Sequence, residues 1–290
     1  MKILVTGANG FIGRSFCQKA SADGNEVLGM VRSPSGLPHP EVLGSLEAPP
    51  WKQIEAFAPD AVVHLAWTAT PGVYLNSPEN PVFLGQSKLF LNRCLTMGVR
   101  HIAAAGTCIE YASDSGPLDE MQSRLSAAFP YSKAKTELFH WLKDSMAGTG
   151  NPWTWFRIFY PYGPGEHSNR LPSFITRQLL AGQPIQLLTP DSIKDYIFID
   201  DLTAAMCRAL EQGFTGPLNL GTGRGVRLRD LAYEVARVVD ADPSLVGDAV
   251  PTARDPWPVM VAGQAGLDRL AWTPRTSLSE GLSRLAHKLQ

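Results

Sequence analysis

A glycine-rich turn close to the N-terminus constrains the fold more than any other feature of this sequence. An apolar run at residues 2–6 leads directly into Gly7-Ala8-Asn9-Gly10-Phe11-Ile12-Gly13, and a helical pattern covers residues 11–22. Glycines spaced three apart permit a tight turn, and a helix that begins there points its N-terminus at bound negative charge. Glycine turns also serve only to reverse a chain, but between a strand and a helix this one predicts a dinucleotide site. The residues expected to contact the dinucleotide there are Gly7, Asn9, Gly10, Phe11, Ile12 and Gly13.

Short apolar runs alternate with helical patterns along the first half of the chain. The runs expected to be strands are residues 2–6, 26–31, 60–66, 101–107 and 153–159. Helical spacing occurs between them, at residues 11–22, 81–97 and 131–146. Several runs are apolar throughout, as strands covered on both faces must be. The alternation predicts an α/β fold with a doubly wound parallel Rossmann sheet, which binds ligands at the carboxyl ends of its strands.

The regular alternation ends at a cluster of helix- and strand-breaking residues, Pro161-Tyr162-Gly163-Pro164-Gly165. We therefore expect residues 1–165 to form the dinucleotide-binding domain and residues 166–290 to form mainly a smaller C-terminal substrate-binding lobe. Strands expected at 195–199 and 218–220 would return to the main sheet, so that residues 192–222 rejoin the first domain. The last predicted helix has an apolar face, expected to pack on the core, that consists of Leu278, Leu282, Leu285 and Leu289.

The composition favours small-molecule chemistry. The formal net charge is −1 and the basic residues are scattered, whereas a nucleic-acid partner usually requires a basic stripe. Four cysteines lie far apart without Cys-x-x-Cys spacing, so we expect reduced thiols and no metal site. Since no segment approaches the ~20 apolar residues that span a bilayer, and no apolar leader precedes the first strand, the sequence predicts a soluble, cytoplasmic protein that binds neither nucleic acid nor membrane.

The end of the second expected strand bears on the choice of cofactor. NAD enzymes usually carry an acidic residue there, which binds the 2′-hydroxyl of the ribose, whereas an arginine suits the 2′-phosphate of NADP. Here the strand ends Met30-Val31-Arg32-Ser33 without an acid. Arg32 would form charge-assisted hydrogen bonds to the phosphate, although a solvated surface arginine is the alternative. We therefore expect NADP(H), with NAD(H) as the second choice.

Tyr131 and Lys135 are the candidate proton-transfer pair. Tyr131 is the only tyrosine with a lysine four residues later, a spacing that places both side chains on one face of a helix. A phenol has a pKa of about 10, and a neighbouring ammonium lowers it by ~1–3 units, so that Tyr131 would exchange a proton with a substrate oxygen near neutral pH. Lys135 would also hold the nicotinamide ribose, and Thr107, at the end of strand 101–107, would polarise the reacting oxygen. Each has an ordinary structural explanation, but their order along the chain favours catalysis.

Together these motifs resemble the extended short-chain dehydrogenases/reductases, the family of NAD(P)-dependent nucleotide-sugar epimerases, dehydratases and reductases. The resemblance covers nearly the whole chain and includes His64-Leu65-Ala66, Arg157-Ile158-Phe159-Tyr160, Tyr162-Gly163-Pro164-Gly165, residues 194–201 and Asn219-Leu220-Gly221-Thr222-Gly223. It implies a nucleoside-diphosphate sugar as substrate and makes a homodimer an expectation. The cofactor contacts that it implies are Leu65, Ala66, Tyr131, Lys135 and Phe159, and the substrate contacts are Thr107, Tyr160, Lys194 and Arg254.

Four positions depart from the usual pattern of that family. Trp67 follows His-x-Ala where the family often has a small residue, and Tyr160 stands where many members have an asparagine. Lys194 replaces the usual arginine before Asp-Tyr, and Ser45 replaces the aspartate expected on the adenine side. These changes concern contacts with substrate and adenine rather than the proton-transfer pair.

The residues after Thr107 narrow the reaction. Nucleotide-sugar 4,6-dehydratases of the family carry Asp-Glu there, whereas Cys108 and Ile109 follow here, so a dehydratase is not expected. An epimerase of the family retains NAD tightly, whereas a reductase draws on NADPH, and Arg32 without an acid favours the reductase. The sequence therefore predicts reduction of a 4-keto-6-deoxy nucleoside-diphosphate sugar, with Tyr131 protonating the forming alkoxide. The alternatives are a nucleotide-sugar 4-epimerase with bound NAD and a non-catalytic NADP(H) sensor.

Overall fold

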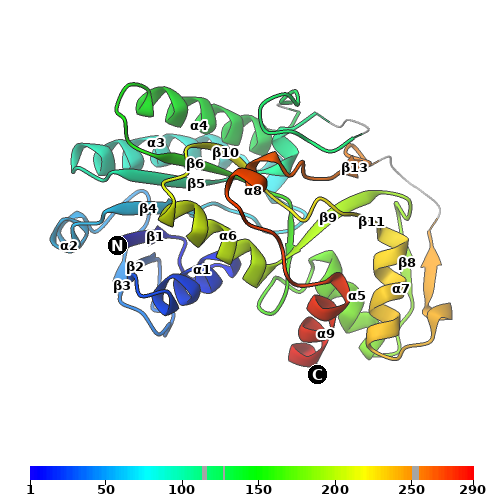
Figure 1. The fold of residues 1–290 in the computed structure, drawn as a ribbon. Helices are drawn as coiled ribbons and strands as arrows, with labels where there is room; N and C mark the ends of the chain where they lie inside the picture. Colours follow the sequence, from blue (N-terminus) through cyan, green and yellow to red (C-terminus); the bar gives the residue numbers. More distant parts are fainter. Residues whose placement is uncertain (113–115, 127, 250–254) are drawn as a thin grey trace. The chain divides into compact units, whose positions relative to one another are not determined.

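Parallel strands and the helices between them occupy the first half of the chain, as the alternating pattern predicts. The structure is a computed structural model that describes residues 1–290 except 113–115, 127 and 250–254 (Figure 1). The chain divides into two compact units. Unit 1 comprises Met1–Glu110, Leu125–Arg157 and Thr203–Leu218, and unit 2 comprises Tyr111–Arg124, Ile158–Leu202 and Asn219–Gln290.

Unit 1 is built on a seven-stranded parallel sheet with the strand order β10-β6-β5-β4-β1-β2-β3. The strands are β1 (Lys2–Thr6), β2 (Glu26–Val31), β3 (Glu41–Leu43), β4 (Ala61–His64), β5 (His101–Thr107), β6 (Trp153–Ile158) and β10 (Gly216–Leu220). The order reverses direction at β1, so the turn after β1 lies where doubly wound sheets bind their ligands. The predicted fold class is confirmed. The three-residue edge strand β3 has no counterpart among the predicted strands, because it is too short to show a pattern.

Helices cover both faces of this sheet. They are α1 (Phe11–Ala22), α2 (Trp51–Phe57), α3 (Asn80–Thr96), α4 (Pro130–Met146) and α6 (Ile199–Glu211), with short 3₁₀ turns at Tyr74–Asn76 and Cys108–Glu110. Figure 1 shows α3 and α4 together over one face, with α1 and α6 on the other. Burial on both faces explains why β4 is apolar over Ala61–Val63 and completely buried.

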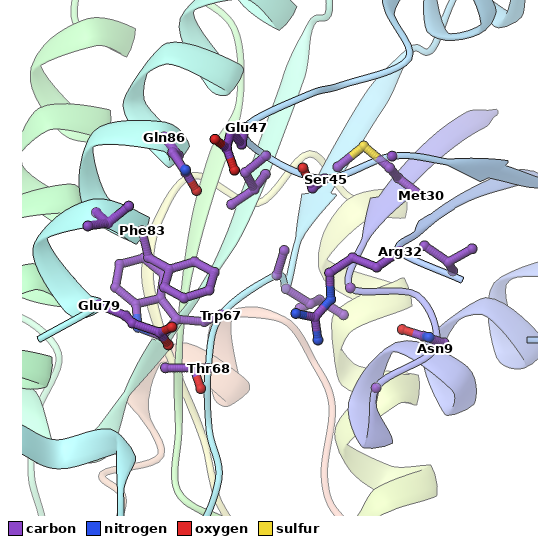
Figure 2. Close-up of a pocket in the computed structure, with 18 residues that line it drawn as sticks. Asn9, Met30, Arg32, Ser45, Glu47, Trp67, Thr68, Glu79, Phe83 and Gln86 are labelled. Atoms are coloured by element: carbon purple, nitrogen blue, oxygen red, sulfur yellow. The ribbon is translucent and has the colours of Figure 1, made fainter. Parts of the chain in front are cut away.

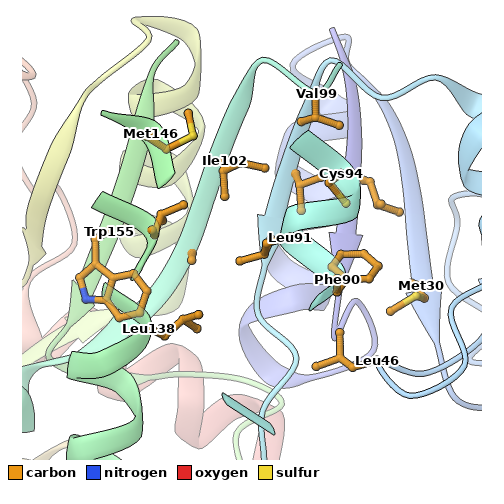
Figure 3. Packing of buried hydrophobic residues seen from close by; sticks show 14 of the residues in the cluster. Met30, Leu46, Phe90, Leu91, Cys94, Val99, Ile102, Leu138, Met146 and Trp155 are labelled. Carbon is orange, nitrogen blue, oxygen red and sulfur yellow. The ribbon is translucent and has the colours of Figure 1, made fainter. Parts of the chain in front are cut away.

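The core beneath α3 and α4 consists of interlocking aliphatic and aromatic side chains. Figure 3 shows Phe90 and Leu91 of α3 and Leu138 and Met146 of α4 within one buried cluster that also contains Trp155 of β6. Each buried side chain of this size contributes roughly 1.5–3 kcal/mol relative to its exposed state. This packing fixes α4 against the sheet, and α4 carries both members of the predicted proton-transfer pair.

Unit 2 contains two smaller sheets. Strand β9 (Ile193–Phe198) is central in the larger one, where it pairs antiparallel with β11 (Gly225–Arg227) and parallel with β7 (Tyr160–Tyr162) and β13 (Val259–Met260). The other sheet pairs β8 (Ile185–Leu187) with β12 (Val246–Asp248). The remaining elements are α5 (Leu171–Leu180), α7 (Leu228–Val238), a 3₁₀ turn at Pro243–Leu245, α8 (Ala265–Arg269) and α9 (Leu278–Leu289).

Two predictions about the second half of the chain have different outcomes. Strand β10 lies at the edge of the main sheet beside β6, as predicted for residues 218–220, whereas β9 belongs to the second sheet, and the prediction for residues 195–199 is corrected. The strands that pair with β9 are β7, β11 and β13, and the residues of β9 alone do not specify partners so distant in the sequence. The apolar face of α9 buries Leu282 and Leu285, and this helix packs against α5 and α7, as predicted. None of the helices in the described ranges is both long and apolar enough to cross a membrane.

Candidate active site and dinucleotide pocket

The turn after β1 can exist only with glycine at two of its positions. Gly7 has a φ of +68°, and a Cβ atom there would lie 2.9 Å from the backbone nitrogen of Ala66. A Cβ atom on Gly13 would lie 2.2 Å from the carbonyl oxygen of Gly7, so α1 could not rest on the turn. No side chain among the described residues caps α1 at Gly10. The N-terminus of α1 is thus available for an anionic group, and Phe11 and Ile12 belong to its first turn.

The hydroxyl of Thr6 fixes the segment that follows β4. Its oxygen accepts hydrogen bonds from the backbone nitrogens of Leu65 and Ala66, both at 3.1 Å, and lies 2.9 Å from Nδ1 of His64. Because the oxygen already accepts two N–H groups, its own proton points to Nδ1, and Nε2 of His64 donates to Oγ of Ser87 at 2.9 Å. Burial, and secondarily the charge of Lys135, lowers the pKa of His64 to about 3. His64 is therefore neutral, and sequence reasoning gave no sign of Thr6 or Ser87 as its partners.

A pocket of about 550 Å³ opens over the glycine turn (Figure 2). It brings together six of the residues predicted to bind a cofactor, namely Gly7, Asn9, Gly10, Arg32, Leu65 and Ala66. The rest of its lining consists of Met30, Val31, Gly44, Ser45, Leu46, Glu47, Trp67, Thr68, Glu79, Val82, Phe83 and Gln86. The walls therefore come from the ends of β1, β2, β3 and β4 and from α3, an arrangement that suits an elongated ligand lying across the edge of the sheet.

Arg32 follows β2 directly and extends into this pocket (Figure 2). Its side chain is exposed, and it makes no ion pair with any described residue. Ser45, which stands at the position of the missing aspartate, accepts a hydrogen bond from the nitrogen of Ala48 at 3.1 Å. The pocket thus presents a guanidinium that pairs with no carboxylate of the described residues within 4.0 Å, although Glu47 and Glu79 also line it.

Tyr131 and Lys135 lie on consecutive turns of α4, which begins at Pro130, a residue suited to the first turn of a helix. Only 8% of Tyr131 and 2% of Lys135 is exposed. The Lys135 Nζ donates a hydrogen bond to the carbonyl oxygen of Ala105 at 2.8 Å and lies 5.9 Å from the centroid of the Tyr131 ring. Burial lowers the pKa of Lys135 to about 7, while the charge of Glu110 acts in the opposite direction. The structure therefore brings the two side chains together in a site with little solvent.

Thr107 ends β5 and is followed by a tight turn that Glu110 closes. The carboxylate of Glu110 accepts a hydrogen bond from the backbone nitrogen of Thr107 at 2.8 Å. The same carboxylate accepts from Nε1 of Trp155 at 3.0 and 3.1 Å and from Nε of Arg157 at 2.9 Å. A Cβ atom at Gly106 would lie 2.2 Å from Nε1 of Trp155, so glycine is required there. Glu110 was not predicted as a functional residue, although it holds the backbone of Thr107.

The other predicted site residues belong to unit 2. Phe159 is buried, and its nitrogen donates to the carbonyl oxygen of Leu220. Lys194 is also buried: its Nζ donates to Oδ2 of Asp255 at 2.6 Å and to the carbonyl oxygen of Trp257, and lies 5.6 Å from the ring centroid of Tyr160. Arg254 lies outside the described residues. A substrate role for Tyr160, Lys194 and Arg254 stays a prediction, and Lys194 would have to share its ammonium with Asp255 to fulfil it.

Comparisons with known proteins identify the family of the chain. Residues 3–221 match the model of the NAD dependent epimerase/dehydratase family. The dTDP-6-deoxy-L-talose 4-dehydrogenase (NAD(+)) of Aggregatibacter actinomycetemcomitans is 25% identical over 247 residues, which cover 81% of this chain and 89% of that protein. The UDP-glucose 4-epimerase of Mycolicibacterium smegmatis is 25% identical over 320 residues, with coverage of 98% and 97%. Among solved structures, the UDP-glucose 4-epimerase of Thermus thermophilus in complex with NAD has a TM-score of 0.86 at 25% identity, covering 100% of this chain and 99% of that one. The chain belongs to the NAD dependent epimerase/dehydratase family.

Proposed function

We propose that this protein is an NADPH-dependent reductase that acts on a 4-keto-6-deoxy nucleoside-diphosphate sugar. The observation that carries the proposal is the guanidinium of Arg32 in the pocket, at the position where an NAD enzyme usually has an acid. A carboxylate there would repel the 2′-phosphate of NADP, whereas Arg32 attracts it. A reductase releases its spent cofactor after each turnover, and NADPH is the cell's reducing pool.

Two features of the glycine turn support a dinucleotide as the cofactor. The turn at Gly7 and Gly13 leaves no room for side chains, and the N-terminus of α1 suits a diphosphate. When it is bound, the nicotinamide supplies the hydride that reduces the ketone. We assign Leu65, Ala66 and Phe159 to contacts with the cofactor, as the family resemblance implies.

Tyr131 would donate its phenolic proton to the oxygen that becomes an alkoxide as hydride arrives. The hydroxyl of Thr107 would hydrogen-bond the same oxygen and orient it, while the charge of Lys135 would favour the phenolate left behind. The burial of Tyr131 and Lys135 strengthens these electrostatic effects, because little water screens them. The phenolate would recover its proton from solvent after the product alcohol leaves.

The name of the Aggregatibacter relative supports the substrate class. It describes dehydrogenation at position 4 of a 6-deoxy sugar nucleotide, and the proposed reaction is a reduction at that position. That name also specifies NAD(+), so the preference for NADPH depends on Arg32 and requires its own measurement.

A 4-epimerase with bound NAD is the second candidate. It is favoured by the 98% coverage of this chain by the Mycolicibacterium UDP-glucose 4-epimerase and by the likeness to the Thermus epimerase in complex with NAD. An epimerase would carry NAD through purification and would interconvert a saturated sugar nucleotide and its C4 epimer without added cofactor.

The decisive experiment mixes the purified protein with NADPH and 4-keto-6-deoxy sugars carried on several nucleoside diphosphates. Loss of nicotinamide absorbance is expected for at least one of them, and its absence with every base would refute the reductase. Tyr131→Phe should reduce turnover by ~10²–10⁴-fold while NADPH binds with unchanged affinity. A protein that only senses NADP(H) would show no turnover to lose, and NADPH binding would be all that could be measured.

A further inference from the structure

Trp67 is held in place by side chains of unit 1 on several sides. Its Nε1 donates a hydrogen bond to Oδ1 of Asn80 at 2.9 Å, and its ring stacks on that of Phe83 with centroids 5.6 Å apart. The ring meets Tyr131 edge-on, with centroids 6.3 Å apart at 77°. The Nζ of Lys135 lies over the indole, 3.9 Å from the centroid. Trp67 therefore contacts both members of the candidate proton-transfer pair.

Asn80 sets the orientation of the indole. It is completely buried at the start of α3, and its Nδ2 donates to the carbonyl oxygens of Tyr74 at 2.8 Å and Ser77 at 3.0 Å. The ring of Tyr74 packs edge-on against Tyr131 with centroids 4.8 Å apart. All three bonds of the Asn80 carboxamide are lost if it rotates. One amide thus fixes two of the aromatic residues that surround Tyr131.

The ammonium of Lys135 is stabilised by a neighbour such as the Trp67 indole, because burial disfavours its charge. It has three N–H donors, and the hydrogen bond to Ala105 satisfies one of them. The titratable groups that face it are Glu110, whose charge favours the ammonium, His64 on β4 and Tyr131 on α4 itself. Within the described part of the chain, no carboxylate lies within ion-pair distance of Lys135. The face of an indole is the best aromatic partner for such a cation.

We propose that Trp67 is a positioning residue for the proton transfer: the face of its indole keeps the Lys135 side chain charged and fixed beside Tyr131. The consequence for turnover rests on the proposed function, whereas the contact itself does not. A residue at this position that only filled space would leave the ionisation of Lys135 unchanged when another apolar side chain replaced it.

The test is a pH titration of the protein without ligands, labelled with ¹⁵N and ¹³C in its lysines and followed by NMR. The Lys135 signal is assigned by its loss in Lys135→Met. In Trp67→Leu, which is apolar but has no aromatic face, the midpoint of Lys135 should fall by about one pKa unit. In Trp67→Phe the fall should be smaller but still measurable, because phenyl is a weaker acceptor of cations; this variant keeps the test decisive if Trp67→Leu does not fold.

Phe83→Leu is the matched control. It removes the ring stacked on one side of Trp67 but leaves the indole face that Lys135 contacts, so the midpoint should stay within a few tenths of the wild-type value. An unchanged midpoint in Trp67→Leu or Trp67→Phe, or an equal shift in Phe83→Leu, would overturn the proposal.

Turnover gives a second, separable readout. With NADPH and a reducible sugar nucleotide, the fall in kcat as the pH rises through the Lys135 midpoint should begin about one pH unit lower in Trp67→Leu. A shifted lysine midpoint without reduction of any sugar nucleotide would reject the proposed function and keep the role of Trp67 in holding the charge. Reduction of a sugar nucleotide together with an unshifted Lys135 midpoint would support the proposed function and reject the role of Trp67.

Discussion

The Nε atom of Arg157 lies 2.9 Å from Oε2 of Glu110, and both side chains are almost completely buried. The carboxylate also accepts hydrogen bonds from Trp155 and from the backbone of Thr107. Breaking a buried ion pair by removing one of its two charges costs about 3–5 kcal/mol. We expect Glu110→Gln to lower the free energy of unfolding by that amount in urea titrations.

The same substitution at an exposed ion pair provides the comparison for Glu110. Glu55 pairs with Arg93 at 2.8 Å, but both side chains are about half exposed. Glu55→Gln should change the free energy of unfolding by less than about 1 kcal/mol. Equal losses in the two variants would mean that the buried network around Thr107 contributes no more than a surface pair.

Arg32→Ala should weaken the binding of NADPH selectively. Losing hydrogen bonds to a charged phosphate costs about 1.5–3 kcal/mol, which corresponds to a rise of roughly 10–150-fold in the Kd for NADPH. The Kd for NADH, which has no 2′-phosphate, should hardly change. Fluorescence titrations with both cofactors measure this, with Arg100→Ala as a control whose exposed guanidinium pairs with Asp60. Equal weakening of NADPH and NADH would contradict the assignment of Arg32.

Two buried histidines should make unit 1 less stable as the pH falls. Burial lowers the pKa of His64 to about 3 and that of His101 to about 4, from an ordinary 6.5. Below pH 6.5 the unfolded chain therefore binds more protons than the folded one, and each histidine reduces the free energy of unfolding by ~1.4 kcal/mol per pH unit until its folded pKa is reached.

His101 permits a clean test of this pH dependence. Its Nε2 lies 3.0 Å from Oγ1 of Thr154, whose hydroxyl donates to the carbonyl oxygen of Phe214, so His101 is the donor. Gln keeps a donor but does not titrate. Between about pH 6 and about pH 5, His101→Gln should lose ~1.4 kcal/mol less than the wild type, measured by urea unfolding. His287 is exposed, and the free energy of unfolding of His287→Gln should change with pH as that of the wild type does. If His101→Gln also changed with pH as the wild type does, His101 would not be a buried neutral imidazole.

Glu166 in unit 2 should make the protein less stable as the pH rises, which is opposite to the effect of the two histidines. Its Oε1 accepts from the nitrogen of Ser173 at 2.9 Å, its Oε2 has no partner among the described residues, and burial raises its pKa to about 7. The folded protein thus binds the extra proton, and stability falls as the pH rises from about 4.5 to 7. Glu166→Gln should be more stable than the wild type at about pH 8, by on the order of 3 kcal/mol, and equally stable near pH 4.5. Thermal unfolding at both pH values tests this; a gain that persists at pH 4.5 would have another cause, and the exposed Glu280→Gln should show none.

Local patterns sufficed for much of the main sheet and its helices. Helix α1 has the predicted bounds, residues 11–22, and α4 begins at Pro130, one residue before the predicted start. Both starts are marked in the sequence itself, by the glycine turn for α1 and by the proline for α4. Strand β9 shows the limit. Its residues predict a strand, but its partners come from β7, β11 and β13, and nothing within the strand specifies them.

In the candidate site, the sequence predicts which residues lie together only where both belong to the same helix or strand. Tyr131 and Lys135 share a helix, so their spacing alone predicts that they lie together. Thr6, Asn80 and Glu110 are polar residues at the ends of elements, and their importance depends on partners that folding brings to them. Trp67 was recognisable as a departure from the family pattern, but its contact with Lys135 requires α4 to pack beside the segment after β4.

The three hydrogen bonds at the Thr6 hydroxyl have a consequence for how the pocket takes up a ligand. The wall formed by Leu65 and Ala66 is immobilised by folding alone, since its amides and the imidazole beside it are tied to β1 and α3 before anything enters. Association therefore need not wait for this wall to become ordered, and no loss of its conformational freedom opposes binding. We therefore expect this side of the pocket to select ligands by a shape that folding has already set, rather than by adapting to them.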